Sequence, residues 1–162
     1  KGTLTLIKAM DILWRRGERV HLVLAGEILE DMKHCLKRYK REYLICQLGE
    51  ITEEEKQRLL FSGDIFVMVS GSDSFGIVYL ESWLYKKPVI ACDSPVFREI
   101  ITEGKDGLFS ALDDPAMLAS RISYLLSHPH IAQEMGQHGY DKVKMQYALV
   151  DKLALLSTYY AQ

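Results

Sequence analysis

Short apolar runs alternate along this chain with longer segments whose apolar residues recur at helical spacing. A short, near-continuous apolar run is typical of a strand that is buried on both faces of a sheet. Such runs occur at Val20–Ala25, Tyr43–Leu48, Ile65–Ser70, Pro88–Cys92 and Gly107–Ala111. Strands that alternate with helices form a parallel sheet with helices on both faces. The pattern therefore predicts an α/β fold of three layers with right-handed crossovers.

The segments between the apolar runs carry helix signals. Thr52-Glu53-Glu54-Glu55 forms a capping box, and Asp114-Pro115 supplies an N-cap followed by proline at the first helical position. The predicted helices span Thr3–Arg16, Ile28–Lys40, Thr52–Phe61, Gly76–Tyr85 and Phe97–Thr102, with one more from Asp114 and two from Ile131 to the end, broken near Tyr147. We assign residues 1–146 to one domain and residues 147–162 to a separate C-terminal helix.

Length, charge and cysteine content limit the classes of function. The chain has 162 residues, enough for one well-buried domain, and its formal net charge of -2 provides no broad basic field for nucleic acid. No apolar run is long enough to span a bilayer. Cys35, Cys46 and Cys92 are odd in number and far apart, which indicates free thiols in a reducing compartment, the cytoplasm. Because the chain opens without Met inside a helical pattern, we expect a fragment of a longer polypeptide.

The segment from Ser70 to Pro88 carries the strongest functional signal. It reads as the end of a strand, a loop of small residues and the start of a helix, with Asp73 in the loop and Glu81 on the helix. This geometry aims backbone N–H groups and the positive end of a helix dipole at one point, which suits a phosphate group. The segment lacks the Gly-Lys-Ser/Thr ending of a P-loop and the glycine spacing of the dinucleotide fingerprint.

The two carboxylates have two interpretations on residue type alone. In the first, Asp73 or Ser74 is a helix N-cap and Glu81 is a surface residue. In the second, Glu81 binds a ligand, because it is flanked by apolar and aromatic residues and a carboxylate in such surroundings usually has a partner. A sugar diol is a suitable partner, since a carboxylate can accept from two adjacent hydroxyls at once.

These residues carry a resemblance that extends along nearly the whole chain. Asp73-Ser-Phe-Gly-Ile-Val-Tyr-Leu-Glu81-Ser-Trp, followed by Lys87-Pro88-Val89-Ile90-Ala91, resembles the signature of glycosyltransferase family 4 (group 1), which reads Glu, seven residues, Glu, and then Gly-Lys-Pro-Val-Ile. Further blocks match in the same order, at Lys1-Gly2, Val20–Gly26, Leu48-Gly49, Ser62–Ile65, Glu103–Phe109 and Asp114-Pro115. The resemblance implies the Rossmann-like, C-terminal, donor-binding half of a GT-B enzyme.

The resemblance also implies roles for particular residues in a retaining glycosyltransferase, which moves a sugar from a nucleotide diphosphate sugar to a hydroxyl acceptor. Asp73, which would contact the donor sugar, and Lys1, which would neutralise the leaving diphosphate, are the catalytic candidates. Glu81 would accept from the ribose hydroxyls. The other donor-binding candidates are Ser74, Phe75, Gly76, Ile77 and Val78 around the helix start, and Gly26 and Gly49 beside the nucleoside. Charge stabilisation of this kind requires no metal and no cofactor.

Two positions depart from the family's pattern. Asp73 replaces the usual Glu, so its carboxylate reaches one methylene less. Lys86 replaces the usual Gly before Lys-Pro. If the backbone at Lys86 is left-handed, this replacement costs about 1 kcal/mol.

The expected partners follow from the same resemblance. We expect the fragment to bind the nucleotide-sugar donor and to be inactive alone, because the N-terminal acceptor domain is missing. The C-terminal helix would cross to that domain, and its uncovered apolar face favours self-association. The parent enzyme is expected in the cytoplasm, with peripheral membrane contact and no nucleic acid partner. Two alternatives stay open: a sugar-nucleotide epimerase of the same architecture, and a non-catalytic nucleotide-binding module.

Overall fold

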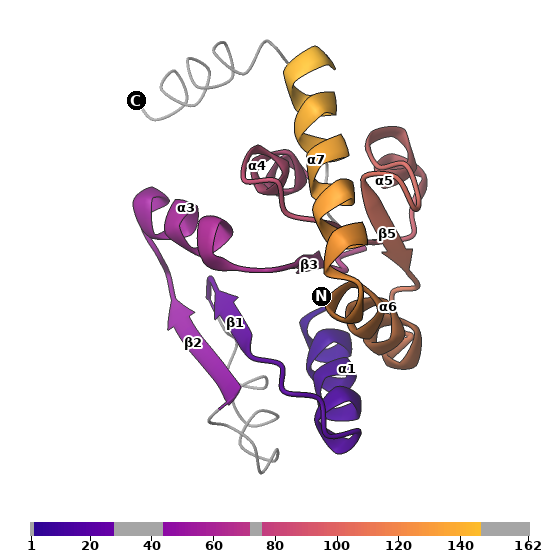
Figure 1. The fold of residues 1–162 in the computed structure, drawn as a ribbon. Coiled ribbons are helices and arrows are strands. Elements are labelled where there is room, and N and C mark those ends of the chain that lie inside the picture. The colour runs from indigo at the N-terminus through magenta and orange to yellow at the C-terminus, as the bar shows by residue number, and fades with distance from the viewer. Residues whose placement is uncertain (1, 28–43, 72–75, 147–162) are drawn as a thin grey trace.

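The computed structural model describes residues 2–27, 44–71 and 76–146, in which helices and parallel strands alternate (Figure 1). The elements are α1 (Thr3–Arg15), β1 (Leu22–Ala25), β2 (Ile45–Gly49), α3 (Glu53–Ser62), β3 (Phe66–Met68), α4 (Ile77–Leu84), β4 (Val89–Cys92), α5 (Pro95–Ile100), β5 (Gly107–Ser110), α6 (Pro115–Ser127) and α7 (Pro129–Gln146). The predicted α/β fold is confirmed. The predicted helix at Ile28–Lys40 and the C-terminal helix at residues 147–162 lie outside the described residues.

The strands pair in parallel but form two groups instead of one continuous sheet. β1 pairs with β2, while β4 lies between β3 and β5. Among the described residues, no strand pairs with the second edge of β1 or of β3, so the sheet is interrupted between them. Figure 1 shows β1, β2 and α3 on the left, α5, α6 and β5 on the right, and α1 below β3.

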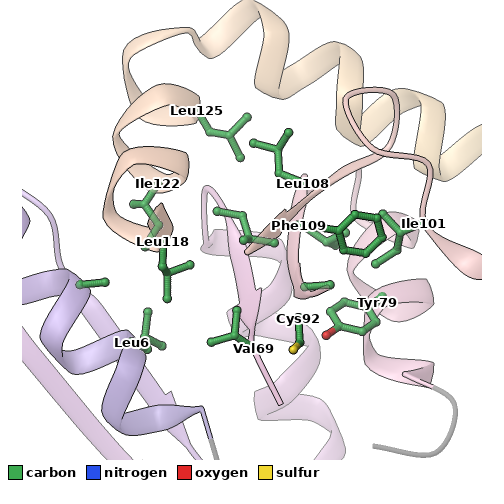
Figure 2. Packing of buried hydrophobic residues seen from close by; sticks show 14 of the residues in the cluster. Leu6, Val69, Tyr79, Cys92, Ile101, Leu108, Phe109, Leu118, Ile122 and Leu125 are labelled. Atoms are coloured by element: carbon green, nitrogen blue, oxygen red, sulfur yellow. The ribbon is translucent and has the colours of Figure 1, made fainter. Parts of the chain in front are cut away.

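One hydrophobic cluster joins the helices to the central strands. α1 packs against α6, and α4 packs against α7. Every residue of β4 is buried, including Cys92, which confirms the buried strand predicted at Pro88–Cys92. Figure 2 shows Leu118 of α6 above Leu6 of α1, and Leu125 of α6 beside Leu108 of β5. The core therefore lies between β4–β5 and the helices that pack on them.

The boundaries of two predicted helices were wrong by about half a turn. α5 was predicted at Phe97–Thr102 but spans Pro95–Ile100. It starts earlier because the Ser94 side chain accepts from the Phe97 N–H at 3.4 Å and Pro95 occupies the first helical position. It ends earlier because the N–H of Thr102 donates to the Asp106 carboxylate instead, at 2.7 Å. α7 begins at Pro129, before the predicted Ile131.

Helix α4 is held by two fully buried aromatic side chains. The Trp83 indole donates to the backbone oxygen of Asp106 at 2.9 Å, and the Tyr79 hydroxyl donates to that of Met68 at 2.5 Å. α7 approaches so closely that a Cβ on Gly139 would lie 2.1 Å from Trp83 Cδ1. Because this face of α4 is fixed inward, Ile77 and Glu81, one turn apart, share the outer face.

None of the helices in the described part of the chain is both long and apolar enough to cross a membrane. This observation concerns residues 2–27, 44–71 and 76–146 alone.

Candidate functional site

Two of the predicted donor-binding glycines meet at the carboxyl ends of β1 and β2. The N–H of Gly26 donates to the backbone oxygen of Gly49 at 2.7 Å, and Ala25 is paired with Gly49 in the strand register. Both glycines have positive φ, 103° at Gly26 and 67° at Gly49, so the chain turns sharply as each strand ends. In parallel α/β folds, ligands bind at this edge of the sheet.

The start of α4 is built on a left-handed glycine. Gly76 is the N-cap residue, with φ 64° and ψ 37°, and within the described part of the chain no side chain caps the helix. The interpretation of Asp73 or Ser74 as the N-cap is therefore wrong. The first N–H groups of a helix have no partner within it, and their dipole favours a negative charge. Ile77, the first helical residue, is 54% exposed, so this helix start is open to a ligand.

The remaining candidates of the loop, Asp73, Ser74 and Phe75, lie outside the described residues, as does Lys1. The residue after Lys1 is described, however. A Cβ on Gly2 would lie 2.0 Å from the backbone oxygen of Val69, so α1 begins directly against the chain that leaves β3. A hollow of about 620 Å³ is bordered by both Gly2 and Gly71. The starts of α1 and of the functional loop therefore lie side by side.

Glu81 lies on the outer face of α4, with 28% of its side chain exposed. One turn separates Ile77 from Glu81, about 6 Å along the helix axis. Because α4 begins at Ile77, within one residue of the predicted start at Gly76, the carboxylate lies about one turn beyond the helix start. Its Oε1 accepts a hydrogen bond from Lys56 Nζ at 2.8 Å.

Lys56 of α3 is the residue that sequence reasoning missed. Its ammonium also contacts Glu53 Oε2 at 2.9 Å, so it bridges two carboxylates. Burial on its own lowers the pKa of Lys56, but the hydrogen bonds to Glu81 and Glu53 outweigh it and raise that pKa above its usual value. The spacing of Glu53 and Lys56 signals a local pair on one helix. Nothing in the sequence signals the contact with Glu81, since it depends on how α3 and α4 pack.

A second groove, somewhat larger than the hollow beside Gly2 and Gly71, lies elsewhere. It has a volume of about 680 Å³ and follows the exposed side of α3, between Leu48, Phe61 and Tyr85. None of the described donor-binding candidates lines it. Within the described residues, no group of three or more His, Cys, Asp or Glu side chains is arranged to hold a metal ion. The described part of the predicted site consists of the glycine turns at Gly26 and Gly49, the start of α4 and Glu81.

Comparisons with known proteins show the family to which the chain belongs. The sequence model of glycosyl transferases group 1 matches residues 1–142. The chain is 30% identical over 141 residues to alpha-1,3/1,6-mannosyltransferase ALG2 of Homo sapiens, covering 81% of this chain and 34% of that protein. The chain thus spans about a third of the length of this relative.

Two solved structures share the fold. The Anabaena protein Alr3699/HepE in complex with UDP superimposes with a TM-score of 0.81 at 20% identity, over 100% of this chain and 46% of that one. The C-terminal domain of a group 1 glycosyl transferase (LpcC) of Francisella tularensis gives a TM-score of 0.78 at 24% identity, over 91% of this chain and 80% of that one. The family match extends across all the elements that form the site, and the chain belongs to the glycosyl transferases of group 1.

Proposed function

We propose that this chain is the C-terminal, donor-binding half of a retaining glycosyltransferase of family 4, which transfers a sugar from a nucleotide diphosphate sugar to a hydroxyl acceptor. One observation carries the proposal: Glu81 lies on the outer face of α4, one turn beyond a helix start that is open to a ligand. A carboxylate at this distance can accept from a ribose while the helix start binds the attached diphosphate.

The other candidate residues would bind further parts of the same nucleotide sugar. Gly26 and Gly49 would border the nucleoside, because their linked turns end the strands next to α3. The backbone of Gly76, Ile77 and Val78 would face the diphosphate. Asp73 would contact the donor sugar, with Ser74 and Phe75 beside it, and Lys1 would neutralise the leaving group. These last four roles rest on the family's pattern.

Catalysis in such a site would be electrostatic. As the bond from the sugar to the diphosphate breaks, negative charge grows on the phosphate oxygens. The N-terminus of α4 and the ammonium of Lys1 would stabilise that charge in the transition state more than in the bound donor. The contact between Gly2 and the end of β3 supports this role, because it places the residue next to Lys1 beside the loop that leads to α4.

The chain alone should bind donor without turning it over. The comparison with the Francisella tularensis domain supports this division, because a C-terminal domain of that family was crystallised by itself. The acceptor would then be bound by a second domain. The absence of a nucleic acid partner and of a metal requirement, the cytoplasmic location, the peripheral membrane contact and self-association through residues 147–162 all stay predictions.

Calorimetric titration of the 162-residue chain with UDP, GDP and ADP tests donor binding. We expect saturable binding of at least one nucleotide, and UDP is the first to try because the Anabaena protein was crystallised with it. No binding of any of the three would overturn an intact donor site in this chain. Detectable sugar transfer by the isolated chain would overturn the proposed division of labour. The epimerase alternative is not favoured, because the matched family consists of glycosyl transferases.

A further inference from the structure

Lys56 occupies a position that is fixed from two directions. On its own helix, its ammonium contacts Glu53 at 2.9 Å, one turn earlier. The first turn of α3 is itself held by the capping box, in which Glu55 Oε2 accepts from the Thr52 N–H at 2.7 Å. The ammonium is therefore directed toward α4 by a firmly capped helix start.

The pair of Lys56 and Glu81 joins two segments that are far apart in the sequence. The side chains are 31% and 28% exposed, respectively, and the ammonium binds a single carboxylate oxygen, Oε1. Ion pairs with this much exposure add little to folding stability. Among the described residues, none donates a hydrogen bond to Glu81 Oε2. The pair thus fixes the orientation of the carboxylate and leaves one oxygen available.

Fixing the orientation of a carboxylate has a consequence for ligand binding. A free Glu side chain must give up rotamer freedom when it accepts a hydrogen bond from a ligand, and this weakens binding. A carboxylate already held by a cation has lost part of that freedom before the ligand arrives. A second hydrogen bond can still form at Oε1, because each carboxylate oxygen has two lone pairs.

We propose that Lys56 is a positioning residue for the nucleotide, holding the Glu81 carboxylate in the orientation that accepts from the ribose hydroxyls. This inference rests on the proposed function, since it takes Glu81 as the ribose-binding residue. It assigns to α3 a part in donor recognition that the signature segment alone does not contain. The effect of Lys56 should pass through the ribose and not through the phosphates.

The test compares two ligands that differ only in the ribose. The nucleoside diphosphate that wild type binds most tightly among UDP, GDP and ADP is titrated in its ribose form and in its 2′,3′-dideoxyribose form. The variants are Lys56→Met, which removes the ammonium but keeps the stem, and Lys56→Arg, which restores a cation. Glu53→Gln is the matched control, because it removes the other partner of Lys56 and leaves the Glu81 contact. Thermal melting shows that each variant is folded, and Lys56→Gln replaces Lys56→Met if the latter is not.

We expect Lys56→Met to weaken binding of the ribose form by about fivefold to tenfold, roughly the cost of ordering one free Glu side chain when the ligand binds. Binding of the dideoxyribose form should change by less than about twofold, as should binding of either form by Glu53→Gln. Lys56→Arg should recover most of the loss. An equal loss for both ligands would mean that Lys56 acts on the phosphates, and no loss for either would mean that it has no role; each result overturns the inference.

Failure of the inference is distinguishable from failure of the proposed function. If Glu81→Gln selectively weakens the ribose form while Lys56→Met does not, Glu81 binds ribose without help from Lys56. If wild type binds none of the nucleotides, the proposed donor site itself is wrong.

Discussion

Gly76 lies directly against the ring of Tyr79, where an added Cβ would be 2.6 Å from Tyr79 Cδ2. The same ring makes edge contacts with Phe66 and Phe97, at centroid distances of 5.9 and 5.1 Å. The start of α4 is therefore held in place by aromatic packing under its N-cap, and not by a capping side chain. The N-cap glycine itself carries no side chain, which suits a surface that binds phosphate through its backbone.

Replacing Gly76 by Ala should destabilise the fold by about 2 kcal/mol or more, because a left-handed non-glycine residue costs about 1 kcal/mol and the contact with Tyr79 adds an overpacking cost of similar size. Gly104→Ala is the matched control, since Gly104 also has positive φ but open space around its Cβ position. It should cost about 1 kcal/mol. Denaturant unfolding of both variants provides the comparison. Equal losses would show that the aromatic contact is unimportant.

Lys86 has a φ of 55°, the only positive value among the described non-glycine residues. The left-handed backbone expected where the family has Gly is thus present. Lys86→Gly should be more stable than Lys86→Ala by about 1 kcal/mol, because both remove the ammonium but only glycine relieves the strain. Compared with wild type, Lys86→Gly should gain less stability, about 0.5 kcal/mol. The Lys86 ammonium lies 5.0 Å from the Tyr140 ring centroid, and the variant loses that contact. Chemical denaturation measures these differences, and Lys86→Ala equal to Lys86→Gly would contradict them.

Much of the fold, but not all of it, could be predicted from the sequence. β4 and β5 were predicted to within one residue, because buried parallel strands appear as continuous apolar runs. The interruption between β1 and β3 could not be predicted, since an apolar run does not reveal which edges are paired. The start of α5 was misplaced because the Ser94-Pro95 start signal was overlooked in favour of the apolar residues that follow it.

The candidate site was predicted in part, for similar reasons. Glu81 and Gly76 could be found because their spacing lies within one segment, and a single segment's pattern is readable along the chain. Lys56 could not, because its contact with Glu81 spans 25 positions and depends on the packing of α3 against α4. Long-range side-chain contacts of this kind follow from tertiary structure and leave no periodic signal in the sequence.

The ion pair of Asp106 and Lys142 should be the most sensitive polar contact of the described core. The Asp106 side chain is 1% exposed and that of Lys142 is 17% exposed. Lys142 also donates to the backbone oxygen of Ile100 at 2.9 Å. Lys142→Met should destabilise the fold by about 3 kcal/mol, because it leaves a buried carboxylate without its cation.

Two further variants control for this loss. Adding Asp106→Asn to Lys142→Met should recover part of the stability, since the uncompensated charge is then removed. Lys105→Met, at an exposed lysine, should change the stability by less than about 0.5 kcal/mol. Urea unfolding of the three variants separates the contributions. A loss for Lys142→Met no larger than that for Lys105→Met would show that the pair is dispensable.

The capping box of α3 should make stability depend on pH in the acid range. The hydrogen bond from the Thr52 N–H, together with the Thr52 hydroxyl, lowers the pKa of Glu55 below its usual 4.5. Because the pKa of Glu55 is lower in the folded state, the stabilisation that its ionised carboxylate provides is complete above pH 4.5. It is lost as the pH falls through the folded-state pKa. The pKa of Asp93 is lowered in the same sense by its hydrogen bonds with Arg98. Glu55→Gln should therefore be less stable than wild type at pH 7, and the difference should shrink below pH 4.5.

Melting temperatures of wild type and Glu55→Gln between about pH 3 and pH 7 test this dependence. Glu50→Gln, at an exposed residue just before the helix, should follow the wild-type curve. A difference between Glu55→Gln and wild type that stays constant over the whole range would contradict the role of the charge.

The most direct test of the account is the dependence of nucleotide affinity on Glu81 and on the ribose together. Wild type and Glu81→Gln are titrated with the same nucleoside diphosphate in its ribose and 2′,3′-dideoxyribose forms. If Glu81 binds the ribose, its replacement should weaken the ribose form by about tenfold and the dideoxyribose form by less than about twofold, because a charge-assisted hydrogen bond becomes a neutral one in the first case alone. Equal affinity of wild type for the two forms, or an equal loss for both in Glu81→Gln, would contradict the account.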